Sequence, residues 1–296
     1  MGLFDKIKEP VFLKESSSAK DQLTALQVLR GQSSGELLKK IEQEIKIVEA
    51  GIYGEEQIMF ELKNSHMPMA VLHDLFLEAD GFTAQIDYLI VTRGKIFIIE
   101  CKNLIGNVEI DNQGSFIRTI SYGKFYRKEG IYSPITQNQR HMELIKKIIL
   151  DARKNAVTRK IAERVFEESF CSLVVLANPK TVLNAKYARK EIKNQVIRSD
   201  QLVAFMRRAN TGVPETSEKN MLDTAESWLR CGKENPVDYL EKYKKDLITG
   251  PESKQILCPK CGSVMIKRVA SKGVNAGREF YGCSRFPKCR GIMNIN

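Results

Sequence analysis

Residues 85–102, QIDYLIVTRGKIFIIECK, consist of two apolar runs, rich in β-branched residues, on either side of a glycine-bearing turn. This pattern predicts a buried β-hairpin. If the turn is centred on Arg93 and Gly94, Asp87 on the first strand faces Glu100 on the second. A one-residue bulge at the turn would break this pairing.

The two acidic side chains need a positive partner, because carboxylates that face each other across a sheet repel. A divalent cation, Mg²⁺ or Mn²⁺, is the obvious candidate, and the backbone carbonyl of Cys101 could be its third ligand. Lys102 shares the strand face of Glu100, because side chains two residues apart point the same way. It would orient the attacking water in phosphodiester hydrolysis. The plainer interpretation is a solvated strand end, and the tripeptide Glu-x-Lys occurs five times in the chain.

A helix is predicted from Ser133, because a capping serine precedes a proline there. Gln137, His141 and Ile145 fall on one stripe of this helix, and the apolar members of the stripe indicate that it faces the sheet. On this evidence alone, Gln137 and His141 could be hydrogen-bonded polar groups of the core.

Four motifs together resemble the NERD family, the nuclease-related domain of the PD-(D/E)XK nucleases. They are GIYGEEQI at 51–58, TAQIDYLIV at 83–91, GKIFIIECKN at 94–103 and SPITQNQRHMELIKK at 133–147. The resemblance implies a restriction-endonuclease-like α/β fold, with a mixed central sheet flanked by helices, and a role in DNA processing. Tyr88 departs from the family, where a His is expected after the Asp.

The resemblance also implies roles for residues outside the hairpin. Glu55, in the first motif, would belong to the site, with Glu56 as its rival; the plainer interpretation is an acid that interacts with a helix dipole. Gln137 and His141 resemble the Gln-x-x-x-Tyr helix of RecB-like nucleases and would hold a phosphate or the attacking water. The predicted catalytic residues are Glu55, Asp87, Glu100, Lys102 and Gln137.

The chain has 296 residues, of which 43% are hydrophobic, enough for one large or two ordinary domains. Residues 1–50 are predicted to form a loosely held arm, up to residue 18, and two helices. The first helix covers about 21–30, and the second opens with a capping box at Ser33 and continues to Val48. The pair would either pack on the next domain or mediate self-association.

The nuclease-like domain is predicted over residues 51–247, with its core motifs in 51–150 and a third helix over about 54–64. Residues 151–250 alternate helix and strand and carry no recognisable chemistry.

Residues 122–128, YGKFYRK, combine aromatic and basic side chains. Such a segment can bind nucleic acid, although an exposed hairpin in any basic protein looks much the same.

A net charge of +11 favours a polyanionic partner. The excess is concentrated in residues 251–296, which carry nine Lys or Arg against two Glu. No apolar run approaches the length of a membrane span, and the start MGLFDKIKEP lacks the apolar region of a signal peptide. We therefore expect a cytoplasmic protein that does not contact the membrane.

Four cysteines near the end of the chain form two close pairs, separated by twenty-one residues. Four thiolates fit a closed tetrahedral Zn²⁺ site, which is structural because no position is open for catalysis. Disulfides are disfavoured in a reducing compartment. The ligands would be Cys258, Cys261, Cys283 and Cys289, and residues 250–255 would form the linker before them.

Nearly all of residues 256–294 resemble the zinc ribbon at the C-terminus of type IA topoisomerases, and the ribbon domain is predicted over 256–296. The resemblance implies binding of single-stranded DNA or of a protein partner. Basic side chains would contact phosphates, and aromatic rings would stack on bases or form the core of the ribbon. The candidate nucleic-acid-binding residues are Lys267, Arg268, Arg278, Phe280, Tyr281, Arg285, Phe286 and Lys288.

The sequence thus predicts a Mg²⁺- or Mn²⁺-dependent deoxyribonuclease that hydrolyses phosphodiester bonds and is targeted to DNA by a zinc ribbon. One alternative is a non-catalytic DNA-binding adaptor that keeps the fold and recruits partners through its N-terminal helices. Another is an RNA nuclease.

Overall fold

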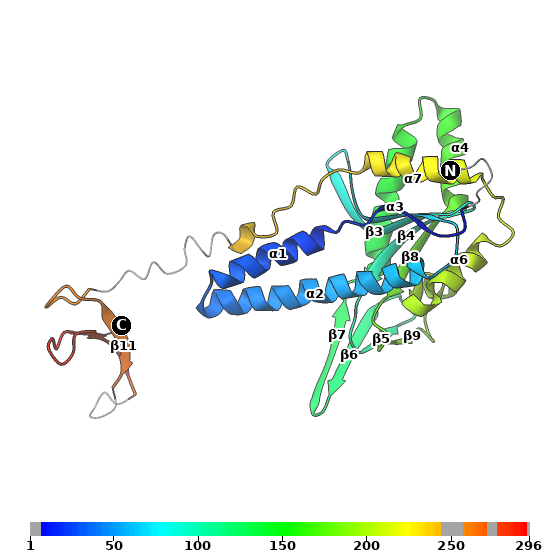
Figure 1. Cartoon of the computed structure of the whole chain (residues 1–296). Coiled ribbons are helices and arrows are strands. Elements are labelled where there is room, and N and C mark those ends of the chain that lie inside the picture. The colour runs from blue at the N-terminus through cyan, green and yellow to red at the C-terminus, as the bar shows by residue number, and fades with distance from the viewer. Residues whose placement is uncertain (1–6, 244–256, 271–276, 295–296) are drawn as a thin grey trace. The chain divides into compact units, whose positions relative to one another are not determined.

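The computed structural model describes residues 7–243, 257–270 and 277–294. The chain divides into two compact units, Met1–Asp238 and Tyr239–Asn296, and Figure 1 shows the elements of each. The predicted linker at 250–255 lies outside the described residues.

A six-stranded mixed sheet forms the centre of the first unit, in the order β1-β2-β3-β4-β8-β10. Strand β3 runs antiparallel to both of its neighbours, β2 and β4, whereas β1 is parallel to β2, and β8 is parallel to β4 and to β10. With helices on both faces, this sheet confirms the predicted fold class. The strands are β1 (Val11–Lys14), β2 (Ala70–Ala79), β3 (Phe82–Val91), β4 (Ile96–Lys102), β8 (Phe170–Leu176) and β10 (Val196–Arg198).

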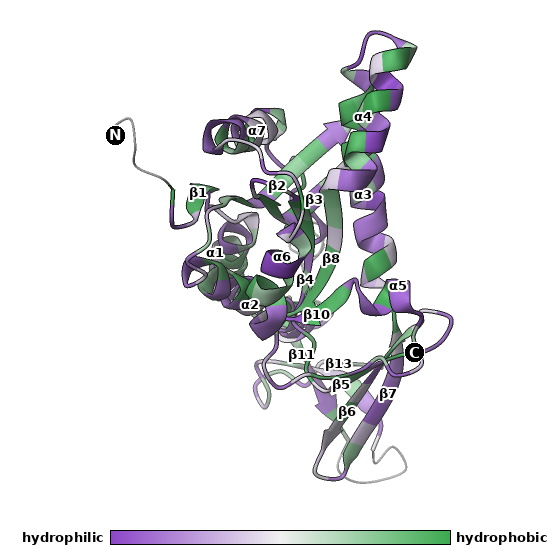
Figure 2. Ribbon diagram, turned by 90° about the vertical axis from the view of Figure 1, so that its right-hand side faces the viewer, coloured by the Kyte–Doolittle hydropathy of each residue, from purple (hydrophilic) through white to green (hydrophobic). Residues whose placement is uncertain are grey.

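Both faces of the sheet are buried, because its central strands carry apolar side chains on both sides. Figure 2 colours the elements by residue hydropathy. Tyr88 and Phe97 point to a core shared with α2 (Gly35–Lys63) and α6 (Leu202–Asn210). Leu89 and Ile98 point to the opposite core. That core is covered by α3 (Pro134–Asp151), α4 (Ala156–Ser169) and α7 (Glu218–Cys231).

The N-terminal region differs from the prediction in two ways. Residues 11–14 are not a loose arm: β1 pairs with β2 and extends the central sheet by one strand. The helices predicted to end at Val48 and to begin near residue 54 are one helix, α2, preceded by α1 (Ser18–Gly31). The glycines taken as a break lie inside α2, and the predicted capping box is absent, because α2 begins after Ser34 without a side-chain cap.

A second, four-stranded sheet in the first unit has the order β7-β6-β5-β9. Its first three strands follow β4 in the chain, and β7 leads directly into α3. The strands are β5 (Asn107–Ile110), β6 (Phe116–Tyr122), β7 (Phe125–Ile131) and β9 (Val182–Asn184), and two short helices, α5 (Lys190–Lys193) and the 3-10 helix η1 (Ser199–Gln201), flank β10.

The second unit contains a three-stranded antiparallel sheet in the order β11-β12-β13. Its strands are β11 (Met265–Val269), β12 (Glu279–Cys283) and β13 (Ile292–Asn294). Met265, Cys258 and Cys283 form its buried cluster. So small an apolar cluster predicts that folding of this unit depends on a bound metal.

Candidate functional site

The β3–β4 hairpin brings Asp87 and Glu100 to one end of the central sheet. The paired stretch ends with Tyr88 opposite Ile99, which confirms the register expected from the sequence and makes Asp87 and Glu100 the next pair. The Asp87 carboxylate accepts a hydrogen bond of 2.7 Å at Oδ2 from the backbone N–H of Cys101. This bond holds the carboxylate against the end of β4.

Glu100 lies at the centre of a buried polar cluster and is only 2% exposed. Its Oε1 is 2.6 Å from Nζ of Lys102, and Lys102 also donates a 3.1 Å hydrogen bond to Oε1 of Gln137. Nδ1 of His141 is 3.6 Å from Glu100 Oε2. The inward orientation predicted for Gln137 and His141 is therefore confirmed, and the predicted side chains on β4 and α3 meet.

The helix that carries Gln137 is fixed to the sheet by a buried amide that sequence reasoning missed. Asn138 is 0% exposed. Its Nδ2 lies 2.9 Å from both the Ile98 carbonyl and Ser172 Oγ and 3.2 Å from the Leu173 carbonyl. These contacts tie α3 to β4 and β8, so the position of Gln137 relative to Lys102 is rigidly set.

Two buried atoms of the cluster lack a hydrogen-bond partner within the described part of the chain: Oε2 of Glu100 and Nδ1 of His141. Leaving a buried carboxylate oxygen without a partner is costly. Carboxylate oxygens are also the ligands that Mg²⁺ and Mn²⁺ prefer. The donor set at Asp87 and Glu100 thus fits a hard divalent cation.

The pKa shifts within the cluster also favour a cation bound at Asp87 and Glu100. Burial, and then the charge of Glu100, raise the pKa of Asp87 well above its ordinary value. Burial also raises the pKa of Glu100, although Lys102 opposes the shift. Burial disfavours the charge on Lys102, but attraction to Glu100 outweighs it and raises the pKa of this lysine. Two carboxyl groups with raised pKa values would gain from a cation placed between them.

His141 is neutral near pH 7 in this environment. Burial, followed by the neighbouring ammonium of Lys102, lowers the pKa of His141 to about 4. The imidazole therefore adds no positive charge beside Glu100, and Lys102 is the cationic partner of this carboxylate.

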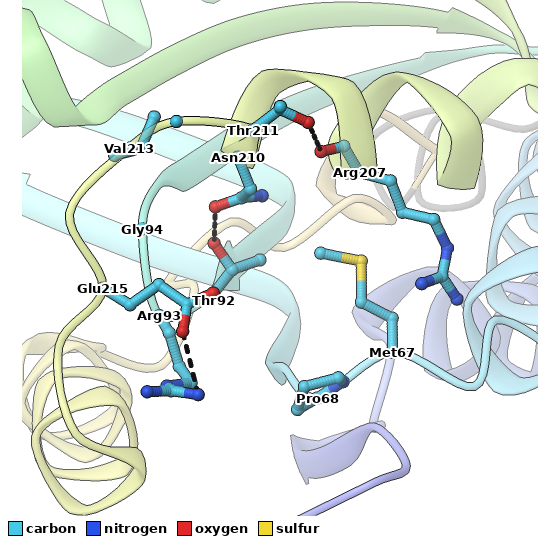
Figure 3. A pocket seen from close by; sticks show the side chains of 11 residues that line it. Met67, Pro68, Thr92, Arg93, Gly94, Arg207, Asn210, Thr211, Val213 and Glu215 are labelled. Atoms are coloured by element: carbon cyan, nitrogen blue, oxygen red, sulfur yellow. Dashed lines mark hydrogen bonds and ion pairs between the residues drawn. The ribbon is translucent and has the colours of Figure 1, made fainter.

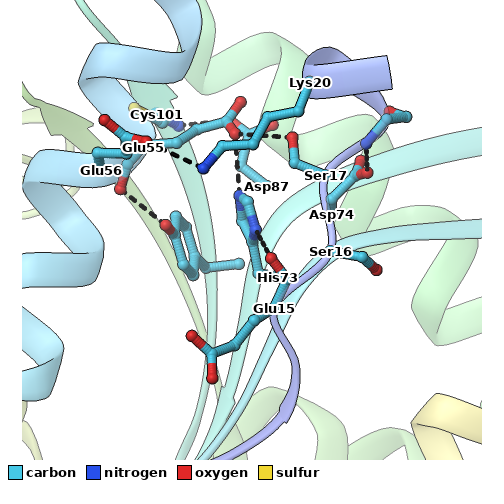
Figure 4. A network of polar contacts seen from close by, with 12 residues as sticks. Glu15, Ser16, Ser17, Lys20, Glu55, Glu56, His73, Asp74, Asp87 and Cys101 are labelled. Carbon is cyan, nitrogen blue, oxygen red and sulfur yellow. Dashed lines mark hydrogen bonds and ion pairs between the residues drawn. The ribbon is translucent and has the colours of Figure 1, made fainter. Parts of the chain in front are cut away.

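Glu55 approaches the sheet from α2, and Figure 4 shows its polar contacts. Oε2 of Glu55 is 2.9 Å from Nε2 of His73 and 3.3 Å from Oγ of Ser17. The hydroxyl of Tyr88 donates a 2.7 Å hydrogen bond to the backbone carbonyl of Glu55. These contacts fix both the side chain and the backbone of Glu55 against β2 and β3.

The rival acid, Glu56, points elsewhere. Its Oε1 pairs with Nζ of Lys20 at 3.0 Å, and its side chain is 55% exposed, against 19% for Glu55. The structure thus places Glu55, not Glu56, on the inner side of α2.

Glu55 does not share one compact ligand set with Asp87 and Glu100. Within the described ranges, the only group of three or more His, Cys, Asp or Glu ligand atoms within 4.8 Å of one another is the cysteine cluster. The two hairpin carboxylates therefore form the candidate Mg²⁺ site, and Glu55 lies beside it, bonded to His73.

His73 was missed by sequence reasoning. It lies directly opposite Tyr88 on β2, and the two rings are stacked at 4.6 Å. Tyr88, which follows Asp87, thus packs against an imidazole from the neighbouring strand. A signal was present in the sequence, because His73 and Asp74 interrupt the otherwise apolar start of AVLHDLFLEA, residues 70–79.

Asp74, the second missed residue, organises the N-terminal segment around this site. It has a left-handed backbone (φ 55°), unusual for a residue other than glycine. Its Oδ2 accepts a 2.6 Å hydrogen bond from the N–H of Ser18, and its Oδ1 accepts one of 2.6 Å from Gln85 Nε2. Asp74 thereby links the start of α1 to the sheet beside Glu55.

A cavity of 480 Å³ lies at the turn end of the same hairpin (Figure 3). Its arginines are already engaged: Arg93 pairs with Glu215 at 2.9 Å, and Arg207 donates a 2.6 Å hydrogen bond to the Ser65 carbonyl. Thr92 and Asn210 are linked at 2.8 Å across the cavity. These contacts join the turn to α6 and leave little unpaired charge for a ligand.

The second unit gathers the four predicted zinc ligands. Their Sγ atoms lie within 4.8 Å of one another, with Cys258 and Cys289 at 3.7 Å and Cys261 and Cys283 at 3.5 Å. Zn–S bonds of about 2.3 Å in a tetrahedron require S–S separations of about 3.8 Å. The cluster thus fits one Zn²⁺, and the zinc-binding role predicted for these cysteines is supported.

The candidate DNA-binding side chains of the ribbon differ in their surroundings. Phe286 is 56% exposed. The Cζ atom of Arg268 lies over the ring of Phe286, 5.7 Å from the ring centroid. Tyr281 packs against the cysteine cluster, and Lys267 pairs with Glu279 at 2.5 Å. Phe280 is half-buried, and Arg278, Arg285 and Lys288 are exposed.

Two protein families match this chain. Residues 50–177 match the Nuclease-related domain (NERD), and residues 255–296 match the Topoisomerase DNA binding C4 zinc finger. Searches of curated proteins and of solved structures found no match. Within the described residues, no helix has the length and apolar character needed to cross a membrane.

Proposed function

We propose that this chain, in which a nuclease-related domain is joined to a C4 zinc ribbon, is a Mg²⁺- or Mn²⁺-dependent DNA nuclease. The observation that carries the proposal is the cluster at the end of the β3–β4 hairpin. Asp87 lies beside a nearly inaccessible Glu100, whose Oε2 has no hydrogen-bond partner among the described residues, and Lys102 is 2.6 Å from the other oxygen.

Each side chain of the cluster has a role in this proposal. Asp87, Glu100 and the backbone carbonyl of Cys101 would hold the cation, which when bound would polarise a phosphoryl oxygen and lower the pKa of a water molecule. Lys102 would orient the attacking water and stabilise the charge that builds on the phosphate. Gln137 holds the ammonium of Lys102 in place through the 3.1 Å hydrogen bond.

Glu55 is proposed to act from the α2 side of the site. Its link to His73 keeps its carboxylate in one orientation, and a cavity of 260 Å³ beside these two residues leaves room for water. Glu55 would contribute to the electrostatic field around Asp87, whose pKa it helps to raise.

The domain boundary predicted at residue 50 falls inside α2, so the catalytic domain would also include β1, α1 and the whole of α2. Residues 256–296 would form the zinc ribbon that binds DNA. None of the seven cysteines is in a disulfide, as expected of a protein in a reducing compartment such as the cytoplasm. We also propose self-association through α1 and α2, because Val28, Ile47 and Phe60 are exposed there. Sedimentation velocity should then detect a dimer; a monomer at every concentration would contradict this.

A plasmid assay tests the enzymatic proposal. Zinc-loaded protein should nick or degrade supercoiled DNA when Mg²⁺ or Mn²⁺ is present, and Lys102→Ala should lose cleavage while still binding DNA. Lys154→Ala, at an exposed position before α4, is the matched control and should retain full activity. Equal cleavage by Lys102→Ala would assign the activity to another site or a contaminant. A matched RNA substrate tests the RNA nuclease alternative, which predicts preferential cleavage of that substrate.

The adaptor alternative is favoured by one observation: the described carboxylates do not form a preassembled group of three ligands. Calorimetric titration with Mg²⁺ separates the two functions. A nuclease should bind the cation and lose that binding in Asp87→Asn and Glu100→Gln, whereas Glu109→Gln on β5 should behave as the unmodified protein. An adaptor need not bind Mg²⁺ at all.

A further inference from the structure

The strands β6 and β7 form a hairpin whose far end is exposed and aromatic. Tyr122 lies opposite Phe125 across the Gly123–Lys124 turn, and Tyr126 lies opposite Ser121. The exposed fractions of the three rings are 85% for Tyr122, 55% for Phe125 and 65% for Tyr126. Because neighbouring strand positions point to opposite faces, rings are presented on both sides of the hairpin.

The charge at this end is positive and largely uncompensated. The hairpin carries Arg118, Lys124, Arg127 and Lys128 against the single acid Glu129. Glu129 is bound by both arginines, at 3.6 Å to Arg118 and 2.5 Å to Arg127. Neither Lys124 nor Lys128 has an ion-pair partner among the residues described, so two ammonium groups remain available beside the three rings.

The position of the hairpin relates it to the cluster at the end of β4. The chain leaves β4 at Lys102 and enters the sheet of β5, β6 and β7 five residues later; it leaves β7 at Ile131 and begins α3, which carries Gln137. The continuous segment of β5, β6 and β7 is therefore joined at one end to Lys102 and at the other to the helix that carries Gln137. Seven residues per strand, at about 3.3 Å each, let the hairpin extend about 23 Å from its base.

We propose that the β6–β7 tip, defined as Tyr122, Lys124, Phe125, Tyr126 and Lys128, binds single-stranded DNA. Exposed rings provide flat apolar surfaces on which unpaired bases stack, and the lysines contact the phosphates between those bases. In a duplex the base faces are covered by their neighbours, so the rings favour the single strand. This binding deepens the proposed nuclease function and rests on it, because the strand held at the tip would be the one presented to Asp87 and Glu100.

The test measures the affinity of the full-length zinc-loaded protein for fluorescent oligothymidylate and for a duplex of equal length, without Mg²⁺. The aromatic variant Tyr122→Ala/Phe125→Ala/Tyr126→Ala should bind the single strand about 5-fold or more weakly, the loss expected for removing at least one stacked base. Duplex affinity should change much less. Phe82→Ala, at the β2–β3 turn and 67% exposed, is the matched control and should bind both DNAs normally.

A second arm separates charge from stacking. Lys124→Ala/Lys128→Ala should weaken binding and reduce its salt dependence, whereas Lys154→Ala/Lys160→Ala, at two exposed positions before and within α4, should do neither. An oligonucleotide containing 2-aminopurine should lose fluorescence when its base stacks on a ring, and the aromatic variant should abolish that change. Circular dichroism of each variant verifies that the hairpin substitutions leave the fold intact.

Unchanged single-strand affinity in a folded aromatic variant would overturn the proposal. The exposed rings of the β6–β7 tip would then be assigned to binding of a protein partner. An equal loss on duplex and single strand would overturn the assignment to single strands. The proposal and the nuclease function fail separately. Normal cleavage by Lys102→Ala, together with loss of single-strand binding in the aromatic variant, would support DNA binding at the β6–β7 tip. The same result would contradict the catalytic role assigned to Lys102.

Discussion

Gly54 of α2 lies so close to Asn103, just past β4, that a Cβ at Gly54 would be 2.7 Å from the Asn103 Cβ. The same Cβ would be 3.2 Å from Sγ of Cys101. The absence of a side chain thus lets α2 approach the end of β4. The next residue in α2 is Glu55, which the close approach places beside β2 and β3.

Replacing Gly54 by Ala should push α2 away from β4. Real Cβ atoms do not approach one another this closely, so backbone must move, and overpacking of this kind typically costs about 1–3 kcal/mol. Urea denaturation should show the loss in the free energy of unfolding, and plasmid cleavage should fall because Glu55 moves with the helix. Gly51→Ala is the control: apart from neighbouring residues of its own helix, no atom would lie within 4 Å of the added Cβ. This substitution should stabilise α2 by up to about 1 kcal/mol. A neutral or stabilising Gly54→Ala would contradict the packing argument.

Asp87→Asn should stabilise the protein at neutral pH when no Mg²⁺ or Mn²⁺ is added. Burial raises the pKa of Asp87, so the folded state binds its proton more tightly than the unfolded chain does. The stability from this group is complete below the unfolded value of about 3.9 and is lost as pH rises through the raised pKa. A tenfold tighter hold on the proton corresponds to about 1.4 kcal/mol of stability that is lost once the pH exceeds the raised pKa.

Urea midpoints measured at several pH values check this prediction. The midpoint of Asp87→Asn should fall less steeply with rising pH than that of the unmodified protein, and saturating Mg²⁺ should stabilise only the latter. Asp21→Asn, at an exposed position of α1, should show the same pH dependence of the midpoint as the unmodified protein. Parallel pH profiles for Asp87→Asn and the unmodified protein would show that burial of Asp87 carries no penalty.

His73 should act as a positioning residue for Glu55. His73→Ala removes the 2.9 Å contact and should lower cleavage about 10- to 100-fold, the usual cost of losing a partner that orients a site residue. His73→Gln should recover part of the activity, because its amide can still donate to Glu55. His66→Ala, which changes a side chain that is 77% exposed, should have no effect. Failure of the Gln variant to recover any activity would reduce His73 to a packing role.

Removing one zinc ligand should unfold the ribbon and spare the first unit. Cys289→Ser should abolish stoichiometric zinc, measured by mass spectrometry of the metal, and weaken DNA binding. Cys231→Ser, an exposed thiol outside the cluster, should keep its zinc. Because the ribbon is a separate compact unit, the main melting transition should stay in place, and a large shift would show that the units stabilise one another.

The hairpin and its register could be predicted because alternation fixes which side chains share a strand face. The turn position at Gly94 was enough to predict that Asp87, Glu100 and Lys102 lie close together. The spacing of the four cysteines was enough to predict a zinc site. The helical stripe containing Gln137 likewise followed from its apolar neighbours.

Other parts depended on contacts between distant segments, which local patterns do not record. Gly54 looks like a helix break in the sequence, but tertiary packing against Asn103 keeps it inside α2. The role of His73 required the register of β2 with β3. Likewise, β1 exists only because the edge of β2 offers unpaired backbone groups to residues 11–14.

The central claim is that Asp87 and Glu100 share one divalent cation beside Lys102. Anomalous diffraction from a crystal soaked in Mn²⁺ tests it most directly, with the zinc at the four cysteines as an internal reference. We predict a manganese peak in contact with both carboxylates, absent in crystals of Glu100→Gln. A zinc peak at the cysteines with no manganese between Asp87 and Glu100 would contradict the account.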